Sequence, residues 1–372
     1  MDSLDAILSS NLKRRERENN LRSLSTSSNL IDFVSNDYLS LARSPELKTK
    51  IATKIESFPV QNGSTGSRLL SGNSDYIVQV ETKLAHIFLA ESAIIFNSGY
   101  SANLAILSSI PQKGDTIIYD ELSHASLKDG ARLSHAKRFS FRHNDLNDLE
   151  SKIRNAEGNV FVVVESIYSM DGDVCPLQEL VHLKNKLGFY LIVDEAHSTG
   201  ICGQGGSGMI ASMELQNYID IRVYTFGKAM GIHGACVVGS NKLKQHIVNF
   251  ARPFIYTTAP SLHSLASVEC AFDFIDEAQQ QTLHDRIAAF VKHASVLGPN
   301  KLTPIQTVMF PGNSNVKKAC EYLQGAGFDV RPILAPTVPV GKERIRITLH
   351  LHNTTEEILE LTNRLIKYKG DL

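Results

Sequence analysis

The feature that most constrains the fold is a regular alternation of strand-like and helix-like segments that starts at Gly114. Short runs rich in apolar and β-branched residues (DTIIYD, KRFSF, NVFVVVES, FYLIVDEAH) alternate with amphipathic segments (HASLKDGARLS, HNDLNDLESKIRNA, PLQELVHLKNKLG). Apolar strands separated by amphipathic helices are typical of a mostly parallel sheet that helices cover on both faces. The later run GACVVGS is expected to form an edge strand. The pattern therefore predicts an α/β fold.

Residues 189–236 carry the side chains that point to a chemistry. One apolar run places Asp194 and His197 at its carboxyl end, and a second run, residues 221–226, places Lys228 just past its own end. Because ligands bind beyond the carboxyl ends of parallel strands, these groups are expected to converge in one crevice. A lysine that forms a Schiff base and a carboxylate that keeps a ring nitrogen protonated are what pyridoxal phosphate chemistry needs. We therefore expect Lys228 and Asp194 to serve a pyridoxal phosphate cofactor.

Two other functions could use the same residues. The string DEAH also occurs in nucleotide-hydrolysing helicases, but these need a G-x-x-x-x-G-K-[ST] loop, and the GK pairs here read GKA and GKE. A metal site could use Asp194, Glu195 and His197, yet no second His or Cys cluster follows at ligand spacing. Neither a nucleotide-hydrolysing site nor a metal site is therefore expected.

Composition excludes several classes of protein. The 38 Lys and Arg residues balance 39 Asp and Glu residues, a net charge of −1, so no basic field for nucleic acid is indicated. The five cysteines lie far apart without a C-x-x-C pair, which is typical of reduced thiols in a cytoplasmic protein. The N-terminal segment lacks the apolar core of a signal peptide, and no apolar run approaches the length of a membrane span. A cytoplasmic enzyme without a membrane partner is expected.

The chain is long enough for a large domain and a small one. We expect an N-terminal helix and arm over residues 1–45, a large cofactor-binding domain over 46–285, and a small C-terminal α+β domain over 286–372. Within the large domain, residues 91–103 predict a strand, a sharp turn and a helix start. Ser98, Gly99 and Tyr100 would there present backbone N–H groups at the positive end of the helix dipole, a candidate phosphate cup.

Nine short strings, in this order, resemble the motifs of the α-oxoamine synthases, pyridoxal phosphate enzymes of the aspartate aminotransferase fold (fold type I). The resemblance runs from about residue 20 to the C-terminus. The strings are SNDYLSL, GSTGSRLLSG, FNSGYSAN, DELSHASLKDG, ESIYSMDGD, LIVDEAHSTG, TFGKA, RPFIYTTAP and PTVPVGKERIRITL. The implied architecture is a large domain with a mostly parallel sheet plus a small C-terminal α+β domain.

The resemblance implies roles for individual residues. Lys228 would form the Schiff base, Asp194 would bind the pyridine nitrogen, His197 would bind the phenolic oxygen with Ser169 nearby, and His124 would stack on the ring. Further implied positions form three sets. The phosphate is expected to contact Ser98, Gly99, Tyr100 and Thr225; Thr257 and Thr258 are expected to reach the phosphate of the other subunit of a homodimer; Arg22, Asn36 and Arg346 are expected to bind substrate.

The family condenses an amino acid with an acyl thioester and releases carbon dioxide. The strings SNDYLSL, HASLKDG and PTVPVGKERIR are most similar to members that join L-alanine to a pimeloyl thioester, carried by coenzyme A or a carrier protein. Members acting on glycine or L-serine remain alternatives, and so does a cofactor-binding partner protein without turnover. The chain departs from the family in having Ser40 where glycine is usual, and Leu334 and Ala335 where an Arg-Pro pair is expected.

Overall fold

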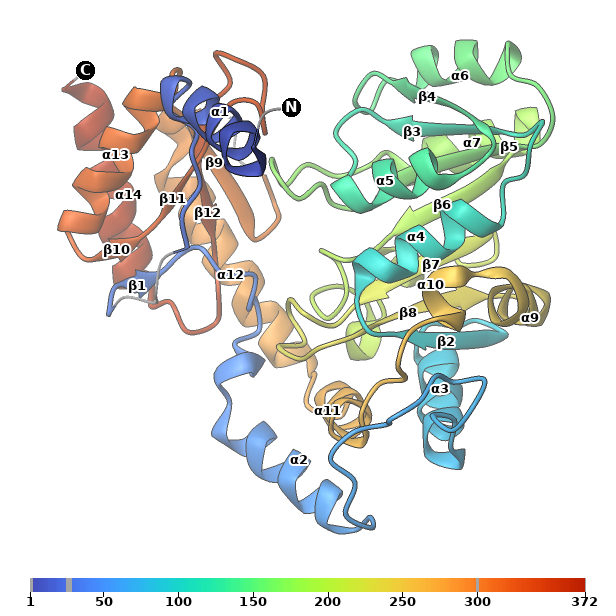
Figure 1. Ribbon diagram of the computed structural model, residues 1–372. Helices are drawn as coiled ribbons and strands as arrows, with labels where there is room; N and C mark the ends of the chain where they lie inside the picture. The colour runs from blue at the N-terminus through green and yellow to red at the C-terminus, as the bar shows by residue number, and fades with distance from the viewer. Residues whose placement is uncertain (1–2, 25–28, 299–300, 372) are drawn as a thin grey trace. The chain divides into compact units, whose positions relative to one another are not determined.

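The computed structural model describes residues 3–24, 29–298 and 301–371, which group into two compact units (Figure 1). The larger unit comprises Asn36–Ser169 and Asp173–Leu283, and the smaller unit comprises Met1–Ser35, Met170–Gly172 and His284–Leu372. This division differs from the expected one at the N-terminus, where residues up to Ser35 group with the C-terminal segment. The physical reason is a non-local strand pair: β1 (Ile31–Asp32) pairs in parallel with β10 (Phe328–Asp329).

The larger unit is built on a seven-stranded sheet in the order β2-β8-β7-β6-β5-β3-β4. Its strands are β2 (Ser92–Phe96), β3 (Thr116–Asp120), β4 (Lys137–Phe141), β5 (Val160–Glu165), β6 (Tyr190–Asp194), β7 (Ile221–Thr225) and β8 (Ala235–Gly239). Neighbouring strands from β7 to β4 are parallel, whereas β8 is antiparallel to both β7 and β2. The expectation of an edge strand at GACVVGS is therefore wrong. Strand β8 folds back from β7 through a short loop, and β2 covers its other side.

Helices cover both faces of this sheet (Figure 1). On one face, α4 (Gly99–Ser109), α5 (Ala125–Leu133), α9 (Asn241–Phe250) and α10 (Arg252–Ile255) share a core with the sheet; on the other lie α6 (Leu146–Arg154), α7 (Leu177–Leu187) and α8 (Met209–Ser212). Successive strand residues alternate between the two cores: Ile117 packs in the first and Ile118 in the second, and Val163 and Val162 do likewise. Strands buried on both faces explain the nearly continuous apolar runs in the sequence.

The larger unit has further helical elements. It contains the 3-10 turn η1 (Leu41–Arg43), α2 (Pro45–Glu56), α3 (Asp75–Ile87), the 3-10 turn η2 (Gln204–Gly206) and α11 (Leu262–Phe272). Helix α11 packs against α2 and α3, and α3 packs against β2. Helix α12 (Glu277–His293) spans the point at which the chain passes to the smaller unit.

The smaller unit holds two small sheets, the pair β1-β10 and an antiparallel sheet in the order β11-β12-β9. Its other elements are α1 (Leu4–Arg17), η3 (Ser295–Leu297), β9 (Ile305–Met309), α13 (Asn313–Gly325), β11 (Arg331–Ile333), β12 (Arg344–Thr348) and α14 (Thr355–Gly370). Helix α14 begins with a capping box in which Thr354 and Glu357 satisfy each other's backbone N–H groups.

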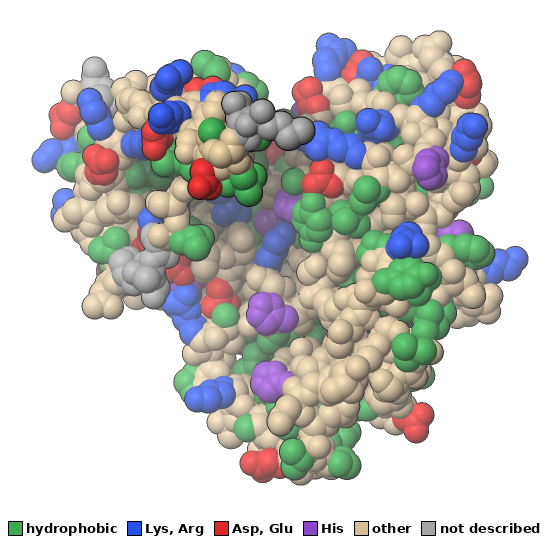
Figure 2. All heavy atoms as spheres, viewed as in Figure 1, with side chains coloured by type: hydrophobic (Ala, Val, Ile, Leu, Met, Phe, Trp, Pro, Cys, Tyr) green, Lys and Arg blue, Asp and Glu red, His purple; other side chains and the backbone are tan. Residues whose placement is uncertain are grey.

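Two surface properties bear on function. Lys and Arg side chains lie among Asp and Glu side chains over the face shown in Figure 2, as the near-zero net charge leads one to expect. Across residues 3–24, 29–298 and 301–371, no helix has both the length and the apolar character needed to cross a membrane.

Candidate active site

Five strands of the larger unit deliver side chains to one edge of the sheet. Strands β2, β3, β5, β6 and β7 point the same way, so their carboxyl ends meet at that edge. A cavity of about 260 Å³ lies there. It is lined by Asn36, Asn97, Ser98, Gly99, Tyr100, Asn103, His124, Ser126, Glu165, Asp194, Ala196, Thr225, Gly227, Lys228, His233 and Gly234. Eight residues predicted from the sequence are therefore brought together: Asn36, Ser98, Gly99, Tyr100, His124, Asp194, Thr225 and Lys228.

Asp194 ends β6 and is 4% exposed, so its carboxylate depends on protein donors. The Asn103 side-chain amide donates to Asp194 Oδ2 at 2.7 Å, and the backbone N–H of Ala196 donates to Oδ1 at 2.9 Å. Both carboxylate oxygens are thus held by fixed donors. A carboxylate oriented in this way suits the binding of a protonated ring nitrogen.

Asn103 also links Asp194 to His124. Its amide donates to Ser126 Oγ at 3.0 Å, and Ser126 Oγ lies 2.7 Å from His124 Nδ1. The Ser126 backbone N–H donates to the same Nδ1, so this nitrogen accepts and the neutral ring carries its proton on Nε2. Burial lowers the pKa of His124, partly offset by the Asp194 charge, which favours that neutral ring. His124 is therefore a neutral, oriented aromatic group in the cavity wall.

Glu165 is a second carboxyl group in the cavity wall. It ends β5, pairs in register with Asp194 on β6, and is 2% exposed. Burial first, and then the negative charge of Asp194, raise the pKa of Glu165 to about 8. Its Oε1 accepts the backbone N–H of His124 at the start of α5. Glu165 is consequently protonated near neutral pH, which leaves the negative charge of this carboxyl pair on Asp194.

The start of α4 and the end of β7 form a cradle for an anion. Ser98 caps α4, with its hydroxyl accepting the backbone N–H of Ser101. A Cβ at Gly99 would lie 2.4 Å from Thr225 Cγ2, so only glycine fits against β7. The buried Thr225 hydroxyl has no hydrogen-bond partner among the residues that the structure describes. A buried hydroxyl and the N–H groups that start a helix are what a phosphate group needs, so the residues present fit pyridoxal phosphate.

Lys228 sits on the short loop between β7 and β8 and is half-buried. The loop is tied together by backbone hydrogen bonds: Gly231 N–H donates to the Lys228 carbonyl at 2.8 Å, and Ile232 N–H donates to the Phe226 carbonyl at 3.0 Å. The turn places Lys228 in the same cavity as Asp194. A primary amine and an oriented carboxylate thus share one small enclosure.

Several predicted residues do not line this cavity. His197 is buried, with Nδ1 2.6 Å from the Tyr38 hydroxyl, and Ser169 is buried in the loop after β5. Thr257 and Thr258 lie at the cavity's border, because the side chain of Asn97 donates to Thr257 Oγ1 at 3.3 Å and to the Thr258 carbonyl at 2.9 Å.

Two predicted substrate-binding arginines belong to the smaller unit. Arg22 donates to Thr337 Oγ1 at 3.2 Å, and Arg346, on β12, donates to Thr348 Oγ1 at 2.9 Å. Arg346 is half-buried, and its strand pairs with β9 and β11. The third predicted substrate residue, Asn36, lines the cavity in the larger unit.

The acidic residue that follows Asp194 has a structural role. Glu195 is fully buried and accepts the backbone N–H groups of Met209 at 2.6 Å and Ile210 at 2.8 Å. Burial raises the pKa of Glu195 to about 7, although these donors oppose the shift. Its carboxyl group is therefore used to hold the start of α8.

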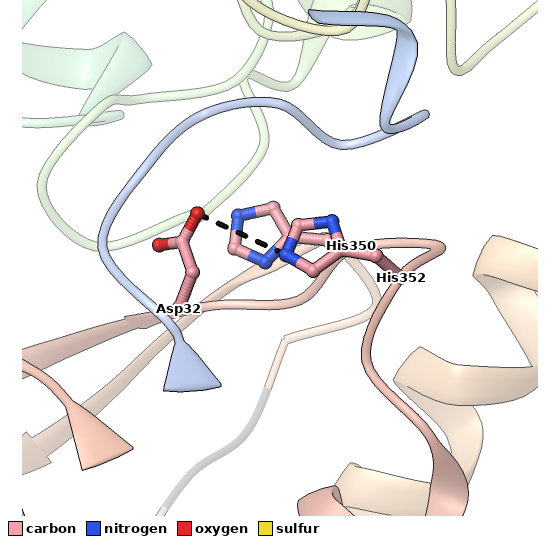
Figure 3. Close-up of side chains that lie close together, drawn as sticks. All are labelled: Asp32, His350 and His352. Atoms are coloured by element: carbon pink, nitrogen blue, oxygen red, sulfur yellow. Dashed lines mark ion pairs between the residues drawn. The ribbon is translucent and has the colours of Figure 1, made fainter. Parts of the chain in front are cut away.

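Within the described ranges, one group of side chains has the spacing of metal ligands, in the smaller unit: Asp32, His350 and His352 (Figure 3). His352 Nε2 lies 3.8 Å from Asp32 Oδ2, and the two imidazole rings stack with centroids 4.5 Å apart. Both nitrogens of His350 face oxygens, with Nδ1 2.8 Å from Asn353 Oδ1 and Nε2 2.8 Å from the Ser35 carbonyl. A metal would have to displace these bonds, so the cluster serves to join β1 to the segment after β12.

Asn103, Glu165 and Ser126 are site residues that the sequence reasoning missed. Asn103 and Ser126 are polar residues buried in helices, and a buried amide must find partners. Glu165 carries the same signal as Asp194, an acid that ends an apolar strand. The acid ends the run NVFVVVES just as Asp194 ends the run FYLIVDEAH.

Comparison with known proteins agrees with this geometry. The family model of aminotransferase class I and II matches residues 28–365. The chain is 38% identical over 378 residues to the 8-amino-7-oxononanoate synthase of Emericella nidulans, covering 93% of this chain and 91% of that protein. Two solved structures align closely. Serine palmitoyltransferase of Sphingomonas wittichii has a TM-score of 0.86 at 27% identity, covering 92% of this chain and 88% of the other.

The second is 8-amino-7-oxononanoate synthase of Francisella tularensis, with a TM-score of 0.79 at 29% identity over 92% of this chain and 99% of the other. These matches confirm the resemblance inferred from the motifs, the fold type I architecture and the expected cofactor. The chain therefore belongs to the aminotransferase class I and II family and is a pyridoxal phosphate-dependent acyltransferase of the α-oxoamine synthase group.

Proposed function

We propose that the chain condenses L-alanine with a pimeloyl thioester to form 8-amino-7-oxononanoate, as in biotin synthesis. In this reaction the alanine α-carbon bonds to the acyl carbonyl carbon, the thiol leaves, and the alanine carboxylate departs as carbon dioxide. The observation that carries the proposal is the convergence of Lys228 and Asp194 in one cavity beside the cradle of Gly99 and Thr225. The choice of alanine and pimeloyl is supported by similarity to 8-amino-7-oxononanoate synthases.

The roles of the residues follow from their positions. Pyridoxal phosphate, when bound, supplies a ring that stabilises negative charge at the α-carbon of an amino acid. Lys228 would hold the cofactor covalently and, once released, accept the α-proton of alanine on its amine. Asp194, oriented by Asn103, would hold the proton on the ring nitrogen. Protonated Glu165 would keep the negative charge localised on Asp194.

The remaining assignments concern the ends of the cofactor and the substrate. Ser98, Gly99, Tyr100 and Thr225 would bind the phosphate, and the neutral ring of His124 would stack on the cofactor. The further roles rest on the family resemblance. His197 and Ser169, which do not line the cavity, would lie at the phenolic oxygen. Arg346 would bind the substrate carboxylate, and Arg22 and the cavity residue Asn36 would also contact substrate.

We also propose an isologous homodimer with shared active sites. Thr257 and Thr258 border the cavity through Asn97 and are exposed enough to reach a neighbouring chain. Hybrids made by subunit exchange test this. Lys228→Ala mixed with a Thr257→Trp, Thr258→Trp variant should regain activity, because both lesions can fall in one site and leave the other intact. No recovery, with both variants shown to dimerise, would instead assign the threonines to their own chain's site.

A second candidate is another α-oxoamine synthase, serine palmitoyltransferase or 2-amino-3-ketobutyrate CoA ligase. The alignment with a solved serine palmitoyltransferase favours keeping it. These enzymes would use the same cofactor residues and differ in the amino acid and the acyl chain. A partner protein without turnover is the remaining alternative, and the presence of Lys228 argues against it.

One experiment separates these possibilities. The purified protein is incubated with L-alanine, glycine or L-serine, each with a short, pimeloyl or palmitoyl thioester of coenzyme A or a carrier protein. Mass spectrometry identifies the product. We expect 8-amino-7-oxononanoate from the alanine and pimeloyl pair; a product only from serine and palmitoyl would assign the chain to the second candidate.

Cofactor attachment has a readout that does not depend on turnover. Borohydride should bleach the visible absorbance and leave a mass adduct on the peptide that contains Lys228. Lys228→Ala should lose the adduct, whereas Lys113→Ala, on an exposed loop, should keep it. An adduct on another lysine would contradict the assignment.

A further inference from the structure

The larger unit contains an apolar groove of about 600 Å³ between α2 and α11. Its apolar walls come from Leu41, Leu47, Ile51 and Ile55 on one side and from Ile232 on the other. In Figure 2, hydrophobic and histidine side chains gather over the region where Figure 1 shows α2 and α11. The volume is within the usual range for small-molecule pockets, and mainly apolar walls favour an apolar ligand.

The groove and the active-site cavity share a wall. His233 lines both, and it lies on the loop that carries Lys228 into the cavity and Ile232 into the groove. The loop packs tightly on the groove floor: a Cβ at Gly231 would lie 2.1 Å from the backbone nitrogen of Ala42. The groove thus begins within a few residues of the reactive amine, on the same hydrogen-bonded turn.

One cation lines the groove without an ion pair. Among the described residues, Lys50 and Lys54 on α2 pair with Asp273 and Glu269, but Lys48 has no carboxylate within ion-pair distance. The one acid of the lining, Glu56, lies eight residues further along α2, roughly 12 Å along the helix axis. Lys48 is therefore available to an anionic group that enters the groove.

We propose that this groove binds the acyl chain of the thioester substrate, with the terminal carboxylate of a dicarboxylic acyl group beside Lys48. The inference rests on the proposed condensation at Lys228. The apolar walls would bury the methylene groups of the acyl chain. Because His233 lines both the groove and the active-site cavity, the thioester end of the chain would lie at the cavity. Lys48 would favour an acyl chain that ends in a carboxylate over a plain alkyl chain.

Chain length gives the first test. Each methylene that leaves water contributes about 0.8 kcal/mol, so kcat/KM should rise about fourfold per methylene from butanoyl to heptanoyl coenzyme A. Ala52→Phe fills the groove from α2 and should flatten this dependence. Thr53→Phe, the next residue on the exposed helix, does not line the groove and should keep the dependence of the unmodified protein.

Terminal charge gives the second test. Lys48→Glu should lower the ratio of kcat/KM for pimeloyl over heptanoyl coenzyme A by about fivefold or more, the upper range for an exposed ion pair. Lys318→Glu makes the same charge change on exposed α13 and should leave the ratio unchanged. The two thioesters have equal chain length, so the ratio isolates the carboxylate.

Three outcomes would overturn the proposal. The first is a length dependence in Ala52→Phe parallel to that of the unmodified protein, and the second is an unchanged ratio in Lys48→Glu. In the third, Ala52→Phe loses activity equally with every thioester and becomes monomeric, which would assign the groove to contact between two copies. The series uses whichever amino acid is accepted, so a wrong choice of alanine would refute the proposed function and leave this test intact.

Discussion

Replacing Asn103 by leucine should impair catalysis without emptying the site. Asn103 is 2% exposed, and its side-chain amide donates to Asp194 Oδ2 at 2.7 Å. Leucine is close to asparagine in size but cannot donate this hydrogen bond. A hydrogen bond to a charged group contributes about 1.5–3 kcal/mol, a factor of roughly ten to 150. Exchange of the alanine α-proton with deuterated water, followed by NMR, should slow by that factor, because Asp194 would hold the ring proton less well.

A matched variant separates this effect from general damage to α4. Ser109→Ala removes a buried hydroxyl from the same helix, where the Ser109 hydroxyl donates to the Ala105 carbonyl one turn earlier. It should exchange the α-proton at the rate of the unmodified protein. If Asn103→Leu binds cofactor normally and exchanges within threefold of that rate, the positioning role of Asn103 is refuted. The midpoint of a pH titration of the visible absorbance should shift in Asn103→Leu but not in Ser109→Ala.

Three other predictions concern stability and cofactor binding. Burial lowers the pKa of His143, but hydrogen bonds with Asp120 and Asp173 outweigh it and raise the pKa to about 9. Because the folded value lies above the ordinary 6.5, the stabilisation is complete below about pH 6.5 and is lost toward pH 9. The difference between the two pKa values corresponds to about 3.4 kcal/mol, and solvent screening of the partly exposed ring lowers this to about 2–3 kcal/mol. Urea unfolding followed by circular dichroism should show this loss, and His143→Gln should lack it. Ser40 has φ of 59°, a left-handed conformation that glycine adopts more easily, so Ser40→Gly should raise the free energy of unfolding by roughly 1 kcal/mol and with it the melting temperature. A lower melting temperature would contradict backbone strain at Ser40. Thr225→Val removes an unsatisfied buried hydroxyl, so it should stabilise the cofactor-free protein while weakening cofactor binding about tenfold, measured by absorbance titration; unchanged affinity would refute the phosphate role.

The fold class could be predicted because its signal is local. Each apolar run is long enough for a strand, and each intervening helix has its own periodicity, so the parallel sheet and the convergence of strand ends follow without distant information. Asp194 and Lys228 were found for that reason, since each follows a strand directly. The cofactor and enzyme class that they suggested are confirmed by the comparisons.

What could not be predicted depends on partners distant in sequence. The grouping of the N-terminal arm with the C-terminal unit rests on pairing of β1 with β10, two-residue strands without periodicity. Strand β8 lies inside the sheet because β2 pairs with its outer side, and nothing in the sequence of β2 indicates which strand it pairs with. Asn103 is an ordinary helical residue in sequence, and only its distance to Asp194 reveals its use.

The antiparallel insertion of β8 also governs the order in which the protein can be completed during synthesis. Strand β2 leaves the ribosome about 140 residues before β8, its neighbour in the described sheet, has been translated. Its unpaired backbone and apolar side chains stay open to other chains for that interval. Strands β4 to β7 can meanwhile pair as they emerge, because each finds a parallel neighbour already made: β4 and β5 join β3, β6 joins β5, and β7 joins β6. The phosphate cradle at Gly99 and Thr225 therefore forms only when β8 brings β2 to the sheet.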